Sequence, residues 1–132
     1  MTVAPSPGCA PLCRQPAFLT IGASDLEYLY KNREFPRNIT AHSDNVVVLM
    51  TQDWCPQWQA MRNFLPEFTA KASIFVLVYN RHEQFSKILA FKENTFGNRD
   101  VPYLRFYRNG VFFDESNYIG KSTFSALIGT AP

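Results

Sequence analysis

The sequence predicts an α/β fold in which a central mixed β-sheet is flanked by helices. Short apolar runs of strand length alternate with segments whose apolar residues recur at helical spacing. The last two strand candidates are joined by Asn109-Gly110, a pair that is typical of a tight hairpin when it lies between apolar runs. Strands that alternate with helices favour parallel pairing, and a final hairpin adds an antiparallel end to the sheet.

Composition indicates a single globular domain. The chain has 132 residues, of which 46% are hydrophobic, 15% aromatic and 18% charged. The formal net charge is +2, and no five like charges gather in one stretch, so we expect neither nucleic acid nor a membrane surface as a partner. The longest apolar runs have the length of strands and are too short to span a bilayer.

Residues 1–16 are predicted to form an irregular, proline-rich arm, and residues 17–132 to form the domain. The arm holds four of the nine prolines and shows no hydrophobic periodicity. The first residues lack the basic start and the apolar segment of a secretory signal, so we expect a cytoplasmic protein.

The first third of the domain is expected to contain one strand and one helix. Residues 18–21 are predicted to form a short strand that ends at Gly22. Ser24 and Glu27 have the spacing of a capping box, which predicts a helix that ends before Pro36. We expect a polar loop from there to residue 45.

Two buried strands enclose a second helix. Residues 46–50 and 74–79 are almost entirely apolar, as expected of strands that are covered on both faces. Pro56 suits the first turn of a helix that continues to Phe68, with a kink at Pro66.

The last part of the chain should form a helix, a hairpin and a closing helix. Apolar residues at helical spacing predict helices over residues 83–92 and 122–128. The strands of the hairpin are predicted at residues 103–107 and 111–113.

Over residues 17–130 the chain resembles the thioredoxin family. A buried strand leads into Trp54-Cys55, a helix follows at once, and Val101-Pro102 lies downstream. The residues that come after that proline with thioredoxin-like spacing are Leu104, Phe106, Gly110 and Gly120.

The resemblance implies a thioredoxin fold with a cis bond between Val101 and Pro102 that places Pro102 against the thiol of Cys55. It makes Cys55 the catalytic residue. It also implies a groove that binds an extended partner segment, formed by Trp54, Pro56, Trp58, Val101 and Pro102.

The position of Cys55 is that of a nucleophile. A cysteine between a strand and a helix faces unpaired backbone N–H groups and the positive end of the helix dipole. Such surroundings can lower a thiol pKa from about 8.5 to about 3.5–7.5, although the negative charge of Asp53 acts in the opposite direction.

Two departures from the family pattern concern resolution of a mixed disulfide. Trp58 occupies the place of the second cysteine, and Leu49 occupies the place of a buried acid that assists proton transfer. With one cysteine in the segment of residues 54–58, thiol–disulfide exchange within this segment stops at the mixed disulfide. We expect no cofactor, and an external thiol such as glutathione would have to release the product. The Cys-Pro start is similar to that of glutaredoxins, but their glycine pair is not evident at Gly120.

The other two cysteines, Cys9 and Cys13, lie in the arm. The four residues from Cys13 to Ala17 extend about 13–14 Å, less than half the width of the domain, so Cys13 cannot reach Cys55. For Cys9 the reach is marginal. The two thiols can pair with each other, link two monomers as a disulfide dimer, or have no redox role. With the histidines they lack the ligand spacing of a zinc site, and no metal is expected.

Two functions remain open. Cys55 is either the nucleophile of a single-thiol oxidoreductase acting on protein or glutathione disulfides, or part of a redox-inactive binding or chaperone module that holds an extended partner segment. Trp54 and Trp58 either form an apolar lip for that partner or pack internally. We interpret five basic residues as solvated: Lys87, Lys92, Arg99, Arg105 and Arg108.

Overall fold

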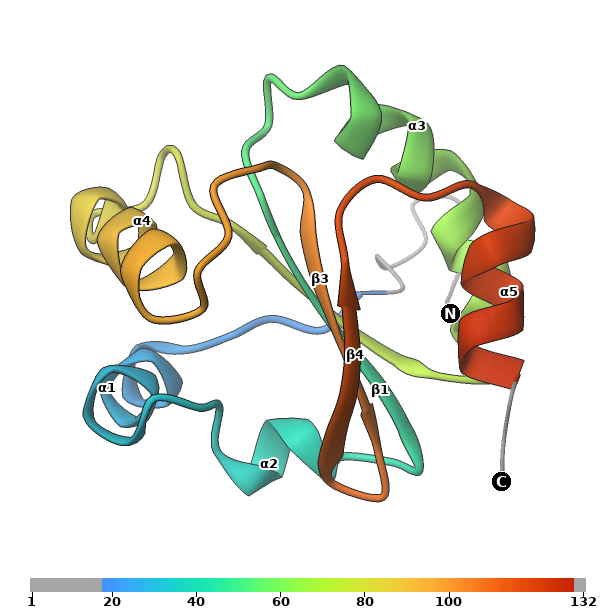
Figure 1. The fold of residues 1–132 in the computed structure, drawn as a ribbon, viewed down its shortest axis with the longest axis horizontal. Helices are drawn as coiled ribbons and strands as arrows, with labels where there is room; N and C mark the ends of the chain where they lie inside the picture. The colour runs from blue at the N-terminus through green and yellow to red at the C-terminus, as the bar shows by residue number, and fades with distance from the viewer. Residues whose placement is uncertain (1–17, 130–132) are drawn as a thin grey trace, which may run out of the picture.

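The structure, a computed structural model, describes residues 18–129. The predicted arm of residues 1–16 and the predicted domain start at Ala17 lie outside the described residues. Five α-helices, one 3-10 helix and four strands are present among the described residues (Figure 1). In chain order they are α1 (Ala23–Asn32), α2 (Arg37–Thr40), β1 (Asn45–Thr51), α3 (Pro56–Phe64), η2 (Leu65–Phe68), β2 (Ser73–Val78), α4 (Phe85–Asn94), β3 (Tyr103–Arg108), β4 (Val111–Ser116) and α5 (Lys121–Gly129).

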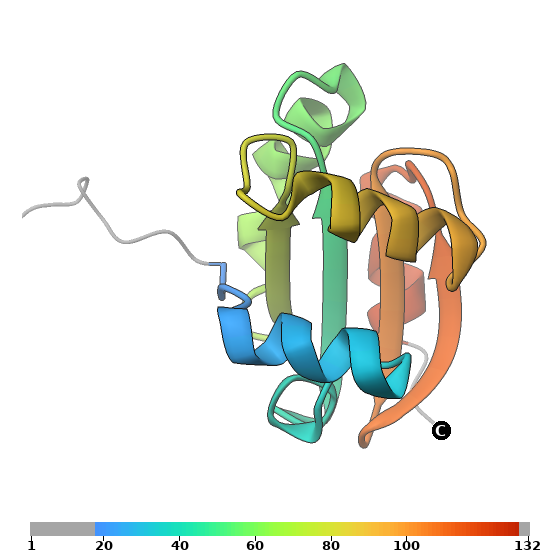
Figure 2. The ribbon, with the colours of Figure 1, turned by 90° about the vertical axis from the view of Figure 1, so that its left-hand side faces the viewer.

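The four strands form one mixed sheet in the order β2-β1-β3-β4. β1 and β2 are parallel, whereas β3 is antiparallel to both β1 and β4. Helices α1 and α4 cover one face, and α3 and α5 cover the other (Figure 2). The predicted mixed sheet between helices is therefore confirmed.

Two apolar clusters, one on each face of the sheet, make up the core. Strand β1 contributes to both because its side chains alternate between the faces and all from Val46 to Thr51 are buried. Cys55 belongs to the cluster under α3 and α5. None of the helices in residues 18–129 has the length and apolar character needed to cross a membrane.

The predicted strand at residues 18–21 is wrong in extent. Only Leu19 pairs, through a parallel bridge to Phe75 in which its N–H donates to Ile74 O at 2.8 Å and its carbonyl accepts from Val76 N at 3.0 Å. The strand stops there because Gly22 is already the N-cap of α1.

The predicted start of α1 is also wrong by two residues. The Gly22 N–H donates to Asp25 Oδ2 at 2.9 Å, so Asp25 makes the bond that the sequence assigned to Glu27. Because the carboxylate of Asp25 accepts from the N–H of Gly22, the helix begins two residues before the predicted start. Ser24 therefore lies inside the helix instead of capping it.

The expected loop over residues 37–45 contains the short helix α2. Pro36 is its N-cap, and the N–H groups of Ile39 and Thr40 donate to Pro36 O at 2.9 and 3.0 Å. Both side chains are buried. Four residues are too few for hydrophobic periodicity to appear, so the sequence pattern gave no sign of this helix.

Two of the five basic residues that we interpreted as solvated are buried, Lys92 and Arg105. The guanidinium of Arg105 lies between the rings of Phe96 and Phe112, at 3.9 and 4.1 Å from their centroids. Its Nη2 donates to Glu34 Oε2 at 2.8 Å. The cation is retained inside because an acid from a distant segment pairs with it.

Two tyrosines complete the surroundings of Arg105. Arg105 Nη1 and Nε donate to the hydroxyl oxygens of Tyr103 and Tyr107, at 2.9 and 2.8 Å. Burial raises the pKa of Tyr103 to about 12. Its hydroxyl therefore stays protonated and donates a hydrogen bond to Glu115. The buried cation of Arg105 is therefore hydrogen-bonded to one carboxylate, that of Glu34, and to the two tyrosine hydroxyls.

The hairpin prediction is confirmed. Asn109 and Gly110 both have positive φ, 52° and 82°, as the two central residues of a type I′ turn require. A Cβ at position 110 would lie 3.1 Å from Arg37 Nη1 and 3.3 Å from Ala41 Cβ.

We expect Gly110→Ala to lower the free energy of unfolding by about 1–2 kcal/mol, because an alanine is strained at positive φ. Gly120→Ala is the matched control, since nothing lies within 4 Å of the added Cβ and no positive φ is present. Urea unfolding followed by circular dichroism measures both. Equal stabilities for the two variants would contradict this account of the turn.

Candidate functional site

Cys55 lies between the end of β1 and the start of α3. It is the N-cap of α3 in an extended conformation, and Pro56 occupies the first turn, where its missing N–H costs no hydrogen bond. The carbonyl of Cys55 accepts from Gln59 N at 3.1 Å. The sulfur is thus held at the N-terminal end of a nine-residue helix, as the sequence predicted.

The sulfur faces the loop that precedes β3. Cys55 Sγ donates to Val101 O at 3.7 Å, and the Val101–Pro102 peptide bond is cis. Val101 is half-buried and Pro102 is buried. The structure therefore brings together Cys55, Val101 and Pro102 from two segments that are far apart in the sequence.

Polar side chains fix the loop that carries Val101. Asn117 Nδ2 donates to Pro102 O at 2.9 Å, and Asn98 and Asn117 also exchange a pair of amide hydrogen bonds. The ammonium of Lys92 donates to Asn98 O at 2.9 Å. Burial lowers the pKa of Lys92. The buried lysine thus braces the loop against which Cys55 packs.

The two tryptophans of the motif have different surroundings. Trp54 is 58% exposed, and its indole N–H donates to Gln52 Oε1 at 2.6 Å. Trp58 is only 3% exposed and packs in the core, with its ring 6.1 Å from that of Phe18. Of the two alternatives from the sequence, internal packing therefore holds for Trp58, whereas Trp54 is exposed and is placed to contact a partner.

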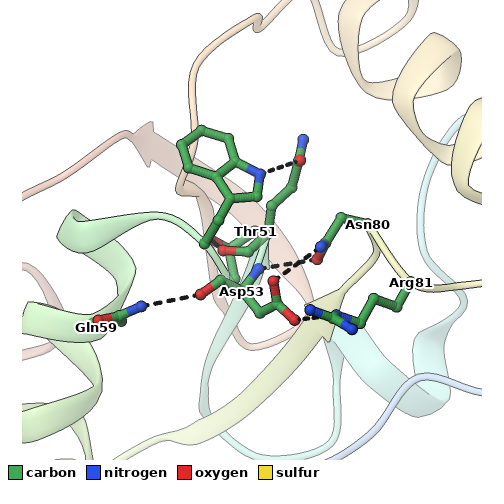
Figure 3. Close-up of polar contacts among 7 residues, drawn as sticks. Thr51, Asp53, Gln59, Asn80 and Arg81 are labelled. Atoms are coloured by element: carbon green, nitrogen blue, oxygen red, sulfur yellow. Dashed lines mark hydrogen bonds and ion pairs between the residues drawn. The ribbon is translucent and has the colours of Figure 1, made fainter.

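The chain reaches Cys55 through a turn that is fixed at Asp53. The N–H of Cys55 donates to Gln52 O at 3.2 Å, which makes Asp53 and Trp54 the central residues of this turn. Asn80 Oδ1 accepts from Asp53 N, and Asn80 Nδ2 donates to Asp53 Oδ1, both at 2.9 Å (Figure 3).

Two more side chains bind Asp53. Arg81 Nε donates to Asp53 Oδ2 at 2.6 Å, and Gln59 Nε2 of α3 donates to Asp53 O at 3.1 Å (Figure 3). The hydrogen bond from Asn80 is the largest cause that holds the pKa of Asp53 below its ordinary value, and the hydrogen bond from Arg81 is the next largest. The carboxylate near Cys55 is therefore ionised and paired.

Sequence reasoning recognised Asp53 only as a nearby charge and missed Asn80 and Arg81. A positional signal was present, because these two residues follow a buried strand that lies parallel to the strand before Cys55. The carboxyl ends of parallel neighbours meet at one edge of the sheet, and polar residues there come together.

Within residues 18–129 no second cysteine accompanies Cys55, and position 49 holds a leucine. Leu49 is fully buried in the same cluster as Cys55, with no carboxylate at that position. Cys55 is the one free cysteine between residues 18 and 129. Cys9 and Cys13 lie outside the described residues. Over the same range, no group of three or more His, Cys, Asp or Glu side chains could hold a metal ion.

The solved structures with a similar fold include thioredoxins. A mutant thioredoxin from Halobacterium salinarum NRC-1 has a TM-score of 0.61 at 18% identity, and the match covers 87% of this chain and 91% of that one. Thioredoxin O2 from Arabidopsis thaliana in the oxidised state has a TM-score of 0.60 at 15% identity, with 86% and 93% covered.

A third neighbour is thioredoxin f2 from Chlamydomonas reinhardtii, with a TM-score of 0.59 at 17% identity and coverage of 85% and 94%. No protein-family model matches the sequence, and comparison with curated protein sequences finds no match. The chain has the thioredoxin fold, as the resemblance of its motifs implies.

Proposed function

We propose that this protein carries out thiol–disulfide exchange through the single thiol of Cys55, with an external thiol completing the reaction. The observation that carries the proposal is the placement of the sulfur at the start of α3, 3.7 Å from the carbonyl of Val101 and next to the cis bond to Pro102. Thioredoxins are among the solved structures of similar fold, which supports this class of chemistry.

In the first step the Cys55 thiolate attacks one sulfur of a disulfide. A bond forms between Cys55 and that sulfur, the old disulfide bond breaks, and the other sulfur leaves as a thiolate that takes up a proton. Trp58 stands where a second thiol would be needed, so the mixed disulfide persists until another molecule attacks it. A second thiolate then attacks the captured sulfur, forms a new disulfide with it and returns Cys55 as the thiolate.

The disulfides of this reaction are those of proteins or glutathione, and glutathione is a suitable external thiol. Exposed Trp54 offers an apolar surface beside Cys55 for a partner segment. Of the residues first assigned to partner binding, Trp54, Pro56 and Val101 are at least partly accessible, whereas Trp58 and Pro102 are buried.

A second candidate is a redox-inactive module that holds an extended segment in the same place. The low exposure of Cys55, 3% for the residue, favours this alternative, because a shielded sulfur is a poor nucleophile. The two functions differ in whether the sulfur forms a covalent bond.

The test uses the full chain with Cys9 and Cys13 both replaced by serine, so that Cys55 is the only thiol. We expect iodoacetamide to alkylate Cys55 in this variant. Incubation with oxidised glutathione should add one glutathionyl group, which dithiothreitol removes. Mass spectrometry measures the adduct.

Cys55→Ser in the same background is the control and should form no adduct. Failure of Cys55 to react with iodoacetamide, together with the absence of a glutathione adduct, would reject the exchange function and leave the binding module. In the insulin reduction assay with dithiothreitol, the wild-type chain should turn over weakly. Strong turnover would show that another cysteine of the chain resolves the mixed disulfide.

A further inference from the structure

We propose that strand β4 pairs with β4 of a second copy of this chain, so that two four-stranded sheets join into one continuous sheet in a homodimer. We call the strand, Val111–Ser116, the β4 edge. The two strands run antiparallel and are related by a two-fold axis perpendicular to the sheet. The inference goes beyond the proposed exchange reaction and does not depend on it.

The β4 edge has an open hydrogen-bonding side. Among residues 18–129, β4 pairs only with β3 and forms one border of the sheet (Figure 2). Backbone N–H and C=O groups that point away from the neighbouring strand can pair with another strand at such a border. Residues 111–116 contain neither proline nor lysine, two residue types that often block a border strand. The backbone is therefore available for pairing.

Large apolar side chains are concentrated on and just after this strand. Of the seven that are exposed among residues 18–129, four lie here: Val111, Phe112, Phe113 and Tyr118. The most exposed of the seven is Val111, at 64%. Single exposed apolar residues are ordinary on a protein surface, but a group along an unpaired strand indicates a contact surface.

The side chains of the β4 edge are divided between the two faces of the sheet. Phe112 and Glu115 point to the face of α1 and α4. There the guanidinium of Arg105 lies 4.1 Å from the centroid of the Phe112 ring, and Glu115 accepts a hydrogen bond from Tyr103. The other four residues pair with or contact Leu104, Phe106 and Arg108 on the face of α3 and α5: Val111, Phe113, Asp114 and Ser116.

A β-bulge makes this order of faces symmetric. Tyr107 pairs with Phe112 and Phe106 with Asp114, so Phe113 is an extra residue in β4. In a regular strand the faces alternate, and the first and sixth residues point to opposite faces. Because of the extra residue, the first and last residues of the β4 edge point to the same face. The order of faces therefore reads the same from either end of the strand.

This symmetry allows two β4 edges to overlap over their full length. Side chains that are opposite each other in an antiparallel pair lie on the same face of the sheet. With full overlap, position 111 is opposite position 116 of the second copy, 112 is opposite 115, and 113 is opposite 114. Both members of each pair share a face. A regular six-residue strand cannot meet this condition with its own copy, and this favours a second copy of the chain as the occupant.

The charges of the two edges are complementary in this register. Asp114 of the second copy is opposite Phe113, and the guanidinium of Arg108 lies 4.7 Å from the centroid of the Phe113 ring. On the other face, Glu115 of the second copy is opposite Phe112, the ring that contacts the buried arginine of β3. Each acid therefore meets a ring that carries a cation of the other copy, and opposite charges on neighbouring strands attract each other.

Analytical ultracentrifugation of the full chain, with a reducing agent present to prevent disulfide-linked dimers, tests the proposal. We expect a reversible equilibrium between monomer and dimer with a dissociation constant on the order of 10–100 μM, because two short strands bury little surface. Amide hydrogen exchange of the wild-type chain, followed by mass spectrometry, should be slower in residues 111–116 above this constant than below it.

Two charge variants test the register. Phe113→Glu puts a second acid opposite Asp114 of the other copy and should raise the dissociation constant at least about tenfold. Adding Asp114→Lys places unlike charges opposite each other and should return the constant to within about threefold of the wild-type value. Tyr28→Glu is the matched control, since it replaces an exposed aromatic ring on α1 by the same acid and should leave the constant unchanged. Circular dichroism checks that each variant keeps the fold.

A chain that stays monomeric about tenfold above the expected range of the constant would overturn the inference. The bulge and the acids would then serve to protect the edge from pairing. Dimers that persist unchanged in Phe113→Glu, or dimerisation without slower exchange in residues 111–116, would show that another surface joins the two copies and would also overturn it. None of these outcomes depends on whether Cys55 reacts with a disulfide.

Discussion

Trp58→Ala is expected to lower the free energy of unfolding by about 3–5 kcal/mol, whereas Trp54→Ala should change it by less than about 0.5 kcal/mol. The two residues are of one type and four positions apart, yet Trp58 is 3% exposed and Trp54 is 58% exposed. Removal of the Trp58 ring leaves a cavity in the cluster that includes Cys55 and Met61. Removal of the Trp54 ring breaks only a surface hydrogen bond to Gln52.

Urea unfolding followed by circular dichroism measures both variants without relying on tryptophan fluorescence. Trp58→Phe is a useful intermediate, since it keeps an aromatic ring and should lose less stability than Trp58→Ala. Similar losses for Trp54→Ala and Trp58→Ala would show that the ring of Trp58 is not part of the core. The same cavity makes Trp58→Cys an ambiguous way to restore a resolving thiol, because the variant loses packing as it gains a sulfur.

Glu34→Ala is expected to lower the free energy of unfolding by about 3 kcal/mol, more than Arg105→Met does. Loss of Glu34 leaves the buried guanidinium of Arg105 without its counter-ion, although the neighbouring hydroxyls of Tyr103 and Tyr107 remain. Loss of Arg105 leaves a carboxylate whose side chain is 35% exposed and can be hydrated. We therefore expect about 1–2 kcal/mol for Arg105→Met.

The double variant with Glu34→Ala and Arg105→Met decides between a charge effect and a packing effect. It should be more stable than Glu34→Ala alone, because methionine removes the uncompensated charge and still fills space between Phe96 and Phe112. Chemical unfolding of the three variants provides the comparison. A double variant less stable than either single variant would mean that the two residues contribute independently.

Much of the fold could be predicted from local sequence patterns. Residues 46–50 and 74–79 are apolar runs of strand length and lie within or next to β1 and β2. Asn109-Gly110 makes the turn that its residue types favour. The predicted kink at Pro66 is a change from α3 to the 3-10 helix η2, because a proline cannot donate to the preceding turn.

The errors at residues 18–45 have local physical causes. Leu19 pairs as a single bridge because Gly22 begins a helix directly afterwards. Asp25 accepts the capping hydrogen bond of α1 from the N–H of Gly22. With Asp25 and Glu27 both close to the start of the helix, the sequence pattern does not determine which of the two acids does so. Helix α2 has too few residues for periodicity to identify it.

The sequence by itself determined the order of helices and strands from β1 onward, the hairpin and the position of Cys55 at a helix start, because each depends on residues that are close together in the chain. The tertiary structure decided which tryptophan is buried, why Lys92 and Arg105 lie inside, and that Asn80 and Arg81 bind the carboxylate of Asp53. Burial and the pairing of charges depend on which distant segments pack together. The same residue type can therefore be a core residue at position 58 and an exposed one at position 54.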